Sequence, residues 1–227
     1  MYEIRRSADQ TATFLNQQVT QMFFLPGTHK EHGLNYSPLK ALVSPRPVGW
    51  ISSHSADNIA NLSPYSFFNA IAELPPMVMF ISAPDVREEN VGGQKDSLAN
   101  ILETGEFGVN IVGMAQAEQM VSSSRNVTSD TDEFDLAGLT KKTAEKISVP
   151  LVAGAPAHLE CEYYDHIKLP DNGRGNHSVM VMGTIVGIHI DDAVIRDGRV
   201  DVSLYQPVAR LGYKEYAAIR DVFEMNS

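Results

Sequence analysis

The sequence predicts a mainly β fold with a few peripheral helices. Short segments rich in β-branched residues and bounded by Gly, Pro or Asp outnumber the segments with a helical period. The two kinds of segment also do not alternate regularly, as they would in a doubly wound parallel sheet. The close spacing of the strand-like segments therefore indicates a closed or sandwiched β architecture.

The first predicted strand runs from Val48 to Ser53. It follows two prolines that fix the backbone around Arg46. Side chains alternate along a strand, so Val48, Trp50 and Ser52 are expected on one face. The other predicted strands are residues 77–82, 107–112, 158–164, 178–191 and 199–204.

Three helices are predicted at residues 96–104, 114–124 and 214–225. The first is expected to be capped by Asp96 and to end at Gly105. Residues 125–150, rich in Asn, Thr and Asp, predict an exposed polar excursion that adds little to the core. Such an excursion could act as a lid or as an interface arm.

Length and composition favour one conventional domain. The chain has 227 residues, of which 43% are hydrophobic, so we expect residues 31–227 to form one domain behind an N-terminal extension of residues 1–30. The formal charge of −10, with scattered Lys and Arg, argues against nucleic acid and anionic lipid as partners. The single Cys161, the lack of a secretory pattern and the lack of a membrane-length apolar run lead us to expect a cytoplasmic protein.

The tripeptide Lys95-Asp96-Ser97 has the parts of a phosphate cradle. The free amides at a helix start favour an anion, Lys95 adds a full positive charge, and Ser97 adds a hydroxyl donor. An ordinary Asp cap beside a solvated lysine is the commoner explanation of this tripeptide when it is taken alone.

Two further segments carry hydroxyl and amide groups. The adjacent Ser52 and Ser53 end a predicted strand, where they either donate to a ligand or start a turn. Residues 61–69 interleave polar side chains with aromatic and apolar ones, and such aromatics are more often core residues than a platform for a cofactor.

Taken together, in this order and spacing, the motifs resemble the flavin reductase-like family of FMN-binding split β-barrels. The resemblance rests on Pro-Arg-Pro-Val-x-Trp-Ile-Ser-Ser at 45–53, Asn-Leu-Ser-Pro-Tyr-Ser-Phe-Phe-Asn at 61–69 and Lys-Asp-Ser-Leu-Ala-Asn at 95–100. The segments 159–161, 181–190 and 207–212 agree with it. Ser53 and Ser97 stand where the family more often has threonine, and both keep the hydroxyl.

The resemblance implies a homodimeric Greek-key split barrel that binds FMN near the subunit interface. The residues it assigns to the phosphate or the ribityl chain are Ser52, Ser53, Asn61, Ser66, Lys95 and Ser97, with Asp96 in the same cofactor-binding motif. The residues it assigns to the isoalloxazine ring are Arg46, Val48, Leu62, Ser63 and Phe67. The implied reaction is hydride transfer from NADH or NADPH to the flavin, which then passes electrons to oxygen, a monooxygenase or another acceptor.

Two other functions stay open at this point. The same barrel could be an FMN-carrying electron-transfer protein that is reduced by a partner protein, or a barrel that has lost flavin. His177, in a glycine-flanked loop, is a tentative catalytic residue, although a plain loop histidine is commoner. No metal site is expected, because strand alternation places Cys161 on the face opposite His158 and His166.

Overall fold

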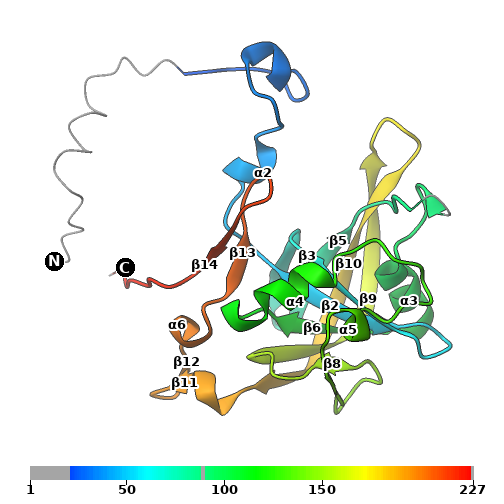
Figure 1. The fold of residues 1–227 in the computed structure, drawn as a ribbon, viewed down its shortest axis with the longest axis vertical. Coiled ribbons are helices and arrows are strands. Elements are labelled where there is room, and N and C mark those ends of the chain that lie inside the picture. The colour runs from blue at the N-terminus through cyan, green and yellow to red at the C-terminus, as the bar shows by residue number, and fades with distance from the viewer. Residues whose placement is uncertain (1–20, 88–89, 226–227) are drawn as a thin grey trace.

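The computed structural model describes residues 21–87 and 90–225. Its main element is a seven-stranded antiparallel sheet with the order β3-β2-β6-β9-β10-β5-β4 (Figure 1). The strands of this sheet are β2 (Gly49–His54), β3 (Ala60–Tyr65), β4 (Phe68–Glu73), β5 (Pro76–Ser82), β6 (Glu106–Ile111), β9 (Ala157–Asp171) and β10 (His177–Ile190). The prediction of a mainly β fold is confirmed.

Smaller elements surround the large sheet. The other strands are β1 (Arg46–Pro47), β13 (Val208–Arg210) and β14 (Tyr216–Ala218) in one sheet, and the pairs β7 (Lys141–Lys142) with β8 (Leu151–Val152) and β11 (Ile195–Arg196) with β12 (Arg199–Val200). The helices are α2 (Leu39–Leu42), α3 (Asp96–Thr104), α4 (Ala117–Ser122), α5 (Glu133–Leu136) and α6 (Val202–Tyr205). The 3₁₀ turns that lie wholly within the described residues are η1 (His29–His32), η3 (Met114–Gln116) and η4 (Asp192–Val194).

The large sheet curls so that the end of β3 comes close to β5. The rings of Tyr65 and Phe80 lie 4.7 Å apart between centroids, and the backbone N–H of Ile81 donates to the carbonyl oxygen of Phe67 at 2.9 Å. These contacts join strands from near the two edges of the sheet, which gives the molecule the shape of a partly closed barrel.

Strand β2 is buried on both faces because it lies between two layers of core. Trp50 packs with Leu62 and Phe134 in one cluster, whereas the next residue, Ile51, packs with Phe107 in the other. Trp50 also donates from Nε1 to Ser123 Oγ at 2.9 Å. The two large apolar residues of β2 therefore serve two cores, one inside the barrel and one under α4 and α5.

Helix α3 has the predicted bounds, and it ends at Gly105 in the left-handed conformation with φ of 78°. The predicted cap is wrong. Lys95 occupies the N-cap position, and the carboxylate of Asp96 instead pairs with Arg87 at 2.8 Å. Leu98 is buried against the barrel core, which fixes the helix start beside β3.

Residues 125–150 were predicted to add little to the core, and this is wrong. Phe134 and Val149 are fully buried. Asp132 caps α5 by accepting from the backbone N–H of Phe134 at 2.9 Å. The phenyl ring of Phe134 points into the core. The segment lies along β3, so it covers one core and lines the site described below.

Two C-terminal predictions are also wrong. The strand predicted at 199–204 stops at β12, because Asp201 accepts from the backbone N–H of Ser203 at 2.9 Å and starts α6. The helix predicted at 214–225 is replaced by β14, which pairs with β13. The guanidinium of Arg210 lies 4.2 Å from the ring centre of Tyr216, so a cross-strand contact supports this pairing.

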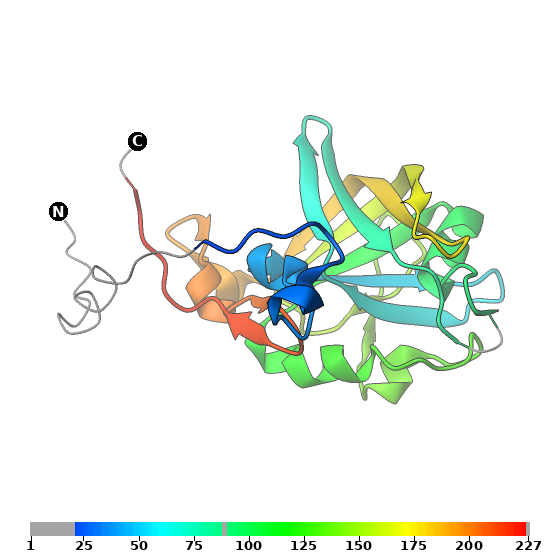
Figure 2. The ribbon, with the colours of Figure 1, turned by 90° about the horizontal axis from the view of Figure 1, so that it is seen from above.

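The remaining predicted elements are present, and β9 extends beyond its predicted end to Asp171. The helix predicted at 114–124 is divided into η3 and α4. Most of the predicted N-terminal extension lies outside the described residues, and its described part runs away from the large sheet (Figures 1 and 2). In the described part of the chain, no helix has the length and apolar character needed to cross a bilayer.

Candidate functional site

A narrow polar cleft lies at the N-terminal end of α3, between β3 and residues 123–127. The predicted residues that line it are Asn61, Ser63, Lys95, Asp96 and Ser97. Its volume is about 40 Å³. About 10–15 Å³ on this scale holds one water. The cleft therefore accommodates a group of a few heavy atoms, such as a phosphate, but not a fused ring.

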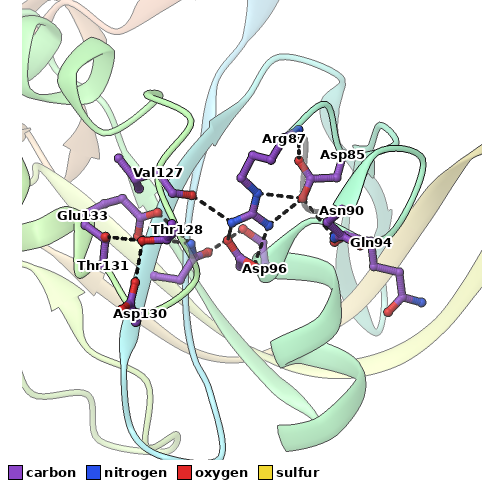
Figure 3. Close-up of polar contacts among 12 residues, drawn as sticks. Asp85, Arg87, Asn90, Gln94, Asp96, Val127, Thr128, Asp130, Thr131 and Glu133 are labelled. Atoms are coloured by element: carbon purple, nitrogen blue, oxygen red, sulfur yellow. Dashed lines mark hydrogen bonds and ion pairs between the residues drawn. The ribbon is translucent and has the colours of Figure 1, made fainter.

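Arg87 joins three walls of the cleft (Figure 3). Its guanidinium donates to Asp85 at 2.5 Å and 2.8 Å, to Asp96 at 2.8 Å and to the carbonyl oxygen of Val127 at 2.9 Å. Burial acts to raise the pKa of Asp85, but hydrogen bonds from Arg87 and Asn90 outweigh it and lower the pKa to about 2. Because two carboxylates neutralise the guanidinium, Arg87 acts mainly as a structural clamp.

Two other cations line the cleft. Lys95 is half-buried and Arg125 is exposed, and neither forms an ion pair within residues 21–87 and 90–225. Ion pairs otherwise hold Arg87 and Lys141 in this region. Lys95 and Arg125 are therefore the charges available to a bound anion.

A buried hydrogen-bond network forms the floor of the cleft. Asn61 donates from Nδ2 to both carboxylate oxygens of Glu133 at 3.1 Å, and its Oδ1 accepts from Ser97 Oγ at 2.7 Å. Ser53 Oγ donates to the same Oδ1 at 3.3 Å and accepts from Asn100 Nδ2 at 3.2 Å. The network connects β2, β3, α3 and α5, so it sets the spacing of the walls.

Glu133 is a buried acid at this floor. It is 5% exposed, and its Oε2 also accepts from the backbone N–H of Leu62 at 3.0 Å. Burial and the negative charge of Asp96 raise its pKa to about 7, although the hydrogen bonds from Leu62 and Asn61 partly oppose the shift.

One polar atom that borders the cleft lacks a partner. Tyr65 is 6% exposed, and its buried hydroxyl group faces the side chains of Ser63, Ser82 and Ser97 without a well-formed hydrogen bond. An unpaired buried hydroxyl is costly. A ligand oxygen in the cleft would satisfy it.

Comparison with known proteins assigns the chain to a family. Residues 42–207 match the model of the flavin reductase like domain. An uncharacterised protein of Aquifex aeolicus is 34% identical over 182 residues, which cover 80% of this chain and 88% of that protein. The chain belongs to the flavin reductase-like family.

Two solved structures have the same fold. Nitrilotriacetate monooxygenase component B from Bacillus cereus matches with a TM-score of 0.81 and 28% identity, over 90% of this chain and 98% of that one. A split barrel domain protein from Shewanella frigidimarina matches with a TM-score of 0.73 and 23% identity, over 91% and 100%. The split-barrel prediction is confirmed, and the general class of this flavin reductase-like protein is flavin-related oxidoreductase.

The other predicted residues of the flavin reductase-like domain lie outside the cleft lining. Ser52 and Ser53 are fully buried behind it. The side chains of Val48 and Leu62 belong to the core under α4. Neither side chain lines the cleft, and Val48 instead borders a separate cavity with Pro45, Pro47 and Phe68.

Arg46 and Phe67 form a separate group. Arg46 is 6% exposed and donates to the carbonyl oxygens of Lys40, Val43 and Leu211, the last at 2.7 Å. Its guanidinium carbon lies 5.8 Å from the ring centre of Phe67, which is 39% exposed. Ser66 is half-buried beside Phe67 at the turn between β3 and β4.

His177 lies in a different cavity, of about 340 Å³, between the β9–β10 hairpin and residues 82–94. Its Nδ1 is 2.8 Å from the carbonyl oxygen of Leu169, and its Nε2 lies 3.9 Å from Asp171 Oδ2. Within the described residues, no group of three or more His, Cys, Asp or Glu side chains is arranged to hold a metal ion.

Sequence patterns did not indicate four of the cleft residues: Tyr65, Arg87, Arg125 and Glu133. Glu133 is 72 positions from Asn61 along the chain, and no local spacing connects them. The one available signal was the Asp-Glu-Phe run at 132–134, in which a capping residue precedes a large apolar side chain.

Proposed function

We propose that this protein binds FMN and that the cleft holds its phosphate. The observation that carries the proposal is the pairing of two free cations, Lys95 and Arg125, with the unpartnered hydroxyl of Tyr65 around a cavity of phosphate size. The start of α3 adds a favourable dipole at the same place. The residues present thus fit an anionic group with several acceptor oxygens.

The proposed contacts with the rest of FMN follow β3 away from the cleft. Ser63 lines the cleft, and Ser66 and Phe67 follow it along the strand and the next turn. The exposed Phe67 ring offers an apolar surface, and Arg46 and Lys40 lie 5.8 Å and 5.9 Å from its centre. Positive charge there favours a reduced, anionic flavin ring.

The proposed reaction is hydride transfer from NADH or NADPH to the flavin, as in a flavin reductase. FMN supplies the redox chemistry when it is bound. Lys95 and Arg125 neutralise the phosphate, and the Asn61 network keeps Ser97 and the start of α3 at a fixed distance from β3. The protein thus contributes binding and orientation.

His177 is retained in the proposal as a candidate contact for the substrate. Its cavity also contains His166 and Lys168, and the apolar Leu98 and Leu102 form another part of the wall. A cavity that has a basic part and an apolar part suits a planar molecule that carries a negative group.

A homodimer is also proposed. The β4–β5 hairpin projects from the body (Figure 2), and it carries Ile71 and Leu74, which are 44% and 92% exposed. Together with the exposed Phe67, these side chains form an apolar surface of the kind that subunit interfaces cover. A cytoplasmic location remains a prediction from the sequence.

The experiment is a visible absorption spectrum of the purified protein after FMN is added and the sample is desalted. NADH and NADPH are then added separately without oxygen. Retained flavin that bleaches with a nicotinamide is the expected result. If the protein neither retains FMN nor turns it over, the assignment of flavin is overturned.

A second function is an FMN-carrying protein that exchanges electrons with a partner protein. It is favoured by the likeness, at 28% identity, to component B of a nitrilotriacetate monooxygenase. Retained flavin that stays oxidised with NADH and NADPH, but is reduced by a protein donor, would support this function over the first.

A further inference from the structure

We propose that Glu133 makes binding of the flavin phosphate depend on protonation: the carboxyl group takes up a proton when the phosphate enters the cleft and then donates it as a hydrogen bond. This inference rests on the proposed function. It names a residue outside the motifs at 45–53, 61–69 and 95–100, and a regulation of the same site by pH.

The first support is the position of the carboxyl group. Glu133 lines the cleft together with Lys95 and Arg125, so a phosphate bound by those cations lies beside it. Two negative groups in a small cleft repel each other strongly, because little water separates them. The repulsion is removed if one of them is protonated.

The second support is the distribution of hydrogen bonds over the two carboxyl oxygens. Of the hydrogen bonds from other residues, Oε2 accepts those from the backbone N–H of Leu62 and from Asn61 Nδ2, whereas Oε1 accepts one from Asn61 Nδ2. The backbone N–H of Glu133 itself also bonds to the carboxyl group. Oε1 is therefore the oxygen with a lone pair free to hold a proton. A protonated Oε1 becomes a donor, which a phosphate oxygen can accept.

The charged groups around Glu133 are of both signs. Asp96 and Lys95 face it from the start of α3, and Arg125 comes from the segment after α4. Asp85 and Arg87 line the far wall and are paired with each other. On its own segment, Asp132 is paired with Lys141, whose ammonium also lies 5.7 Å from the Phe134 ring centre.

With these charges around it, Glu133 has a pKa of about 7, so it is about half protonated at neutral pH. Asp96 already disfavours the charged form, and a phosphate dianion adds to that effect. The pKa of Glu133 must therefore rise further when the phosphate binds. By linkage, the affinity of the protein for FMN falls as the pH rises above 7.

The test compares FMN with riboflavin, which lacks the phosphate, at pH 5.5 and pH 8.5. Glu133→Gln keeps an acceptor oxygen for Leu62 and Asn61 but has no charge. We expect this variant to bind FMN as wild type does at pH 5.5 and more tightly at pH 8.5, by about tenfold for each unit by which the phosphate raises the pKa, up to a limit of about 30-fold set by the pKa of about 7 in the free protein. Riboflavin should show no such difference.

A matched control is Asp135→Asn. Asp135 is an exposed acid on the same short helix and does not line the cleft. Its removal lowers the net negative charge equally, so it reports any general electrostatic effect. It should change the affinity for FMN by the same small factor at both pH values.

A second measurement needs only the wild-type protein. Heats of FMN binding at pH 8, in buffers of different ionisation enthalpy, give the number of protons taken up. A phosphate monoester with a second pKa near 6 is already a dianion at pH 8, so it takes up none itself. We expect a net uptake of up to one proton with FMN and none with riboflavin.

The possible failures are distinct. Equal pH dependence in wild type and Glu133→Gln, or no proton uptake at pH 8, would overturn the role of Glu133 while leaving FMN binding intact. No binding of FMN by either protein would overturn the proposed function and this inference with it.

Discussion

The amide of Asn61 donates to both carboxylate oxygens of Glu133 at 3.1 Å. This contact joins β3 to α5 and makes a segment from the polar excursion part of the cleft. The other end of the amide accepts from Ser97 at 2.7 Å, so one side chain connects the acid to the start of α3. Asn61 therefore sets both the position of Glu133 and the width of the cleft.

Asn61→Ala is expected to destabilise the protein. It leaves Glu133 and the hydroxyl of Ser97 without their shared partner in a buried place, which costs about 1–3 kcal/mol. Urea unfolding at pH 7 measures the loss. Asn69→Ala, at an exposed position of β4, is the control and should change stability by less than about 0.5 kcal/mol. Equal losses in both variants would contradict the role of Asn61.

Because the pKa of Glu133 is raised, the free energy of unfolding should fall as the pH rises. Its pKa is about 7 when folded and 4.5 as a free side chain, so the folded state holds the proton more tightly. Its contribution is full below pH 4.5 and is lost as the pH rises through 7, a difference of about 3 kcal/mol.

Unfolding of wild type and Glu133→Gln from pH 4 to pH 9 checks this sign. The variant should gain stability relative to wild type between pH 4.5 and pH 7, and the difference should then stay constant. A difference that does not change with pH would show that Glu133 has an ordinary pKa.

Because the pKa of Glu160 is lowered, its contribution to the free energy of unfolding should have the opposite dependence on pH. Its fully buried carboxylate accepts from the backbone N–H groups of Glu145, Lys146 and Ile147 at 2.6–3.1 Å and contacts His189. Burial acts to raise its pKa, but these donors outweigh it and lower the pKa to about 2. The stabilisation of about 3 kcal/mol is present above pH 4.5 and is lost as the pH falls toward 2.

Glu160→Gln should therefore be less stable than wild type at pH 7, and the gap should narrow between pH 4.5 and pH 2. Glu162→Gln, an exposed neighbour on β9, serves as the control. A gap that is the same at pH 7 and pH 2.5 would mean that the charge of Glu160 does not hold residues 145–147.

Local patterns predicted the parts of the fold that depend on local interactions. Helix α3 ends at Gly105 because glycine accepts the left-handed conformation, and this is visible in the sequence. The C-terminal strand β14 was predicted as a helix because apolar residues recur there every three or four positions. Its conformation is instead set by pairing with β13, which this spacing does not reveal.

For the site too, local motifs were predicted from the sequence and long-range contacts were not. Lys95 and Ser97 stand in one short motif, so they were found together, and the structure brings Asn61 to them through the pairing of β3 with β2. Glu133 and Arg125 come from a segment whose polar composition predicted solvent exposure. Arg125 is exposed as this predicted, but Glu133 is buried because the neighbouring Phe134 fills the core under β3, which composition alone does not reveal.

The most direct test of the account is the dissociation constant of FMN and of riboflavin for wild type, Lys95→Ala and the surface control Lys214→Ala. A charge-assisted hydrogen bond contributes about 1.5–3 kcal/mol, so Lys95→Ala should weaken FMN about 10- to 100-fold. Riboflavin should bind wild type and Lys95→Ala alike, and Lys214→Ala should change neither ligand. Equal weakening of FMN and riboflavin by Lys95→Ala would contradict the assignment of the cleft to the phosphate.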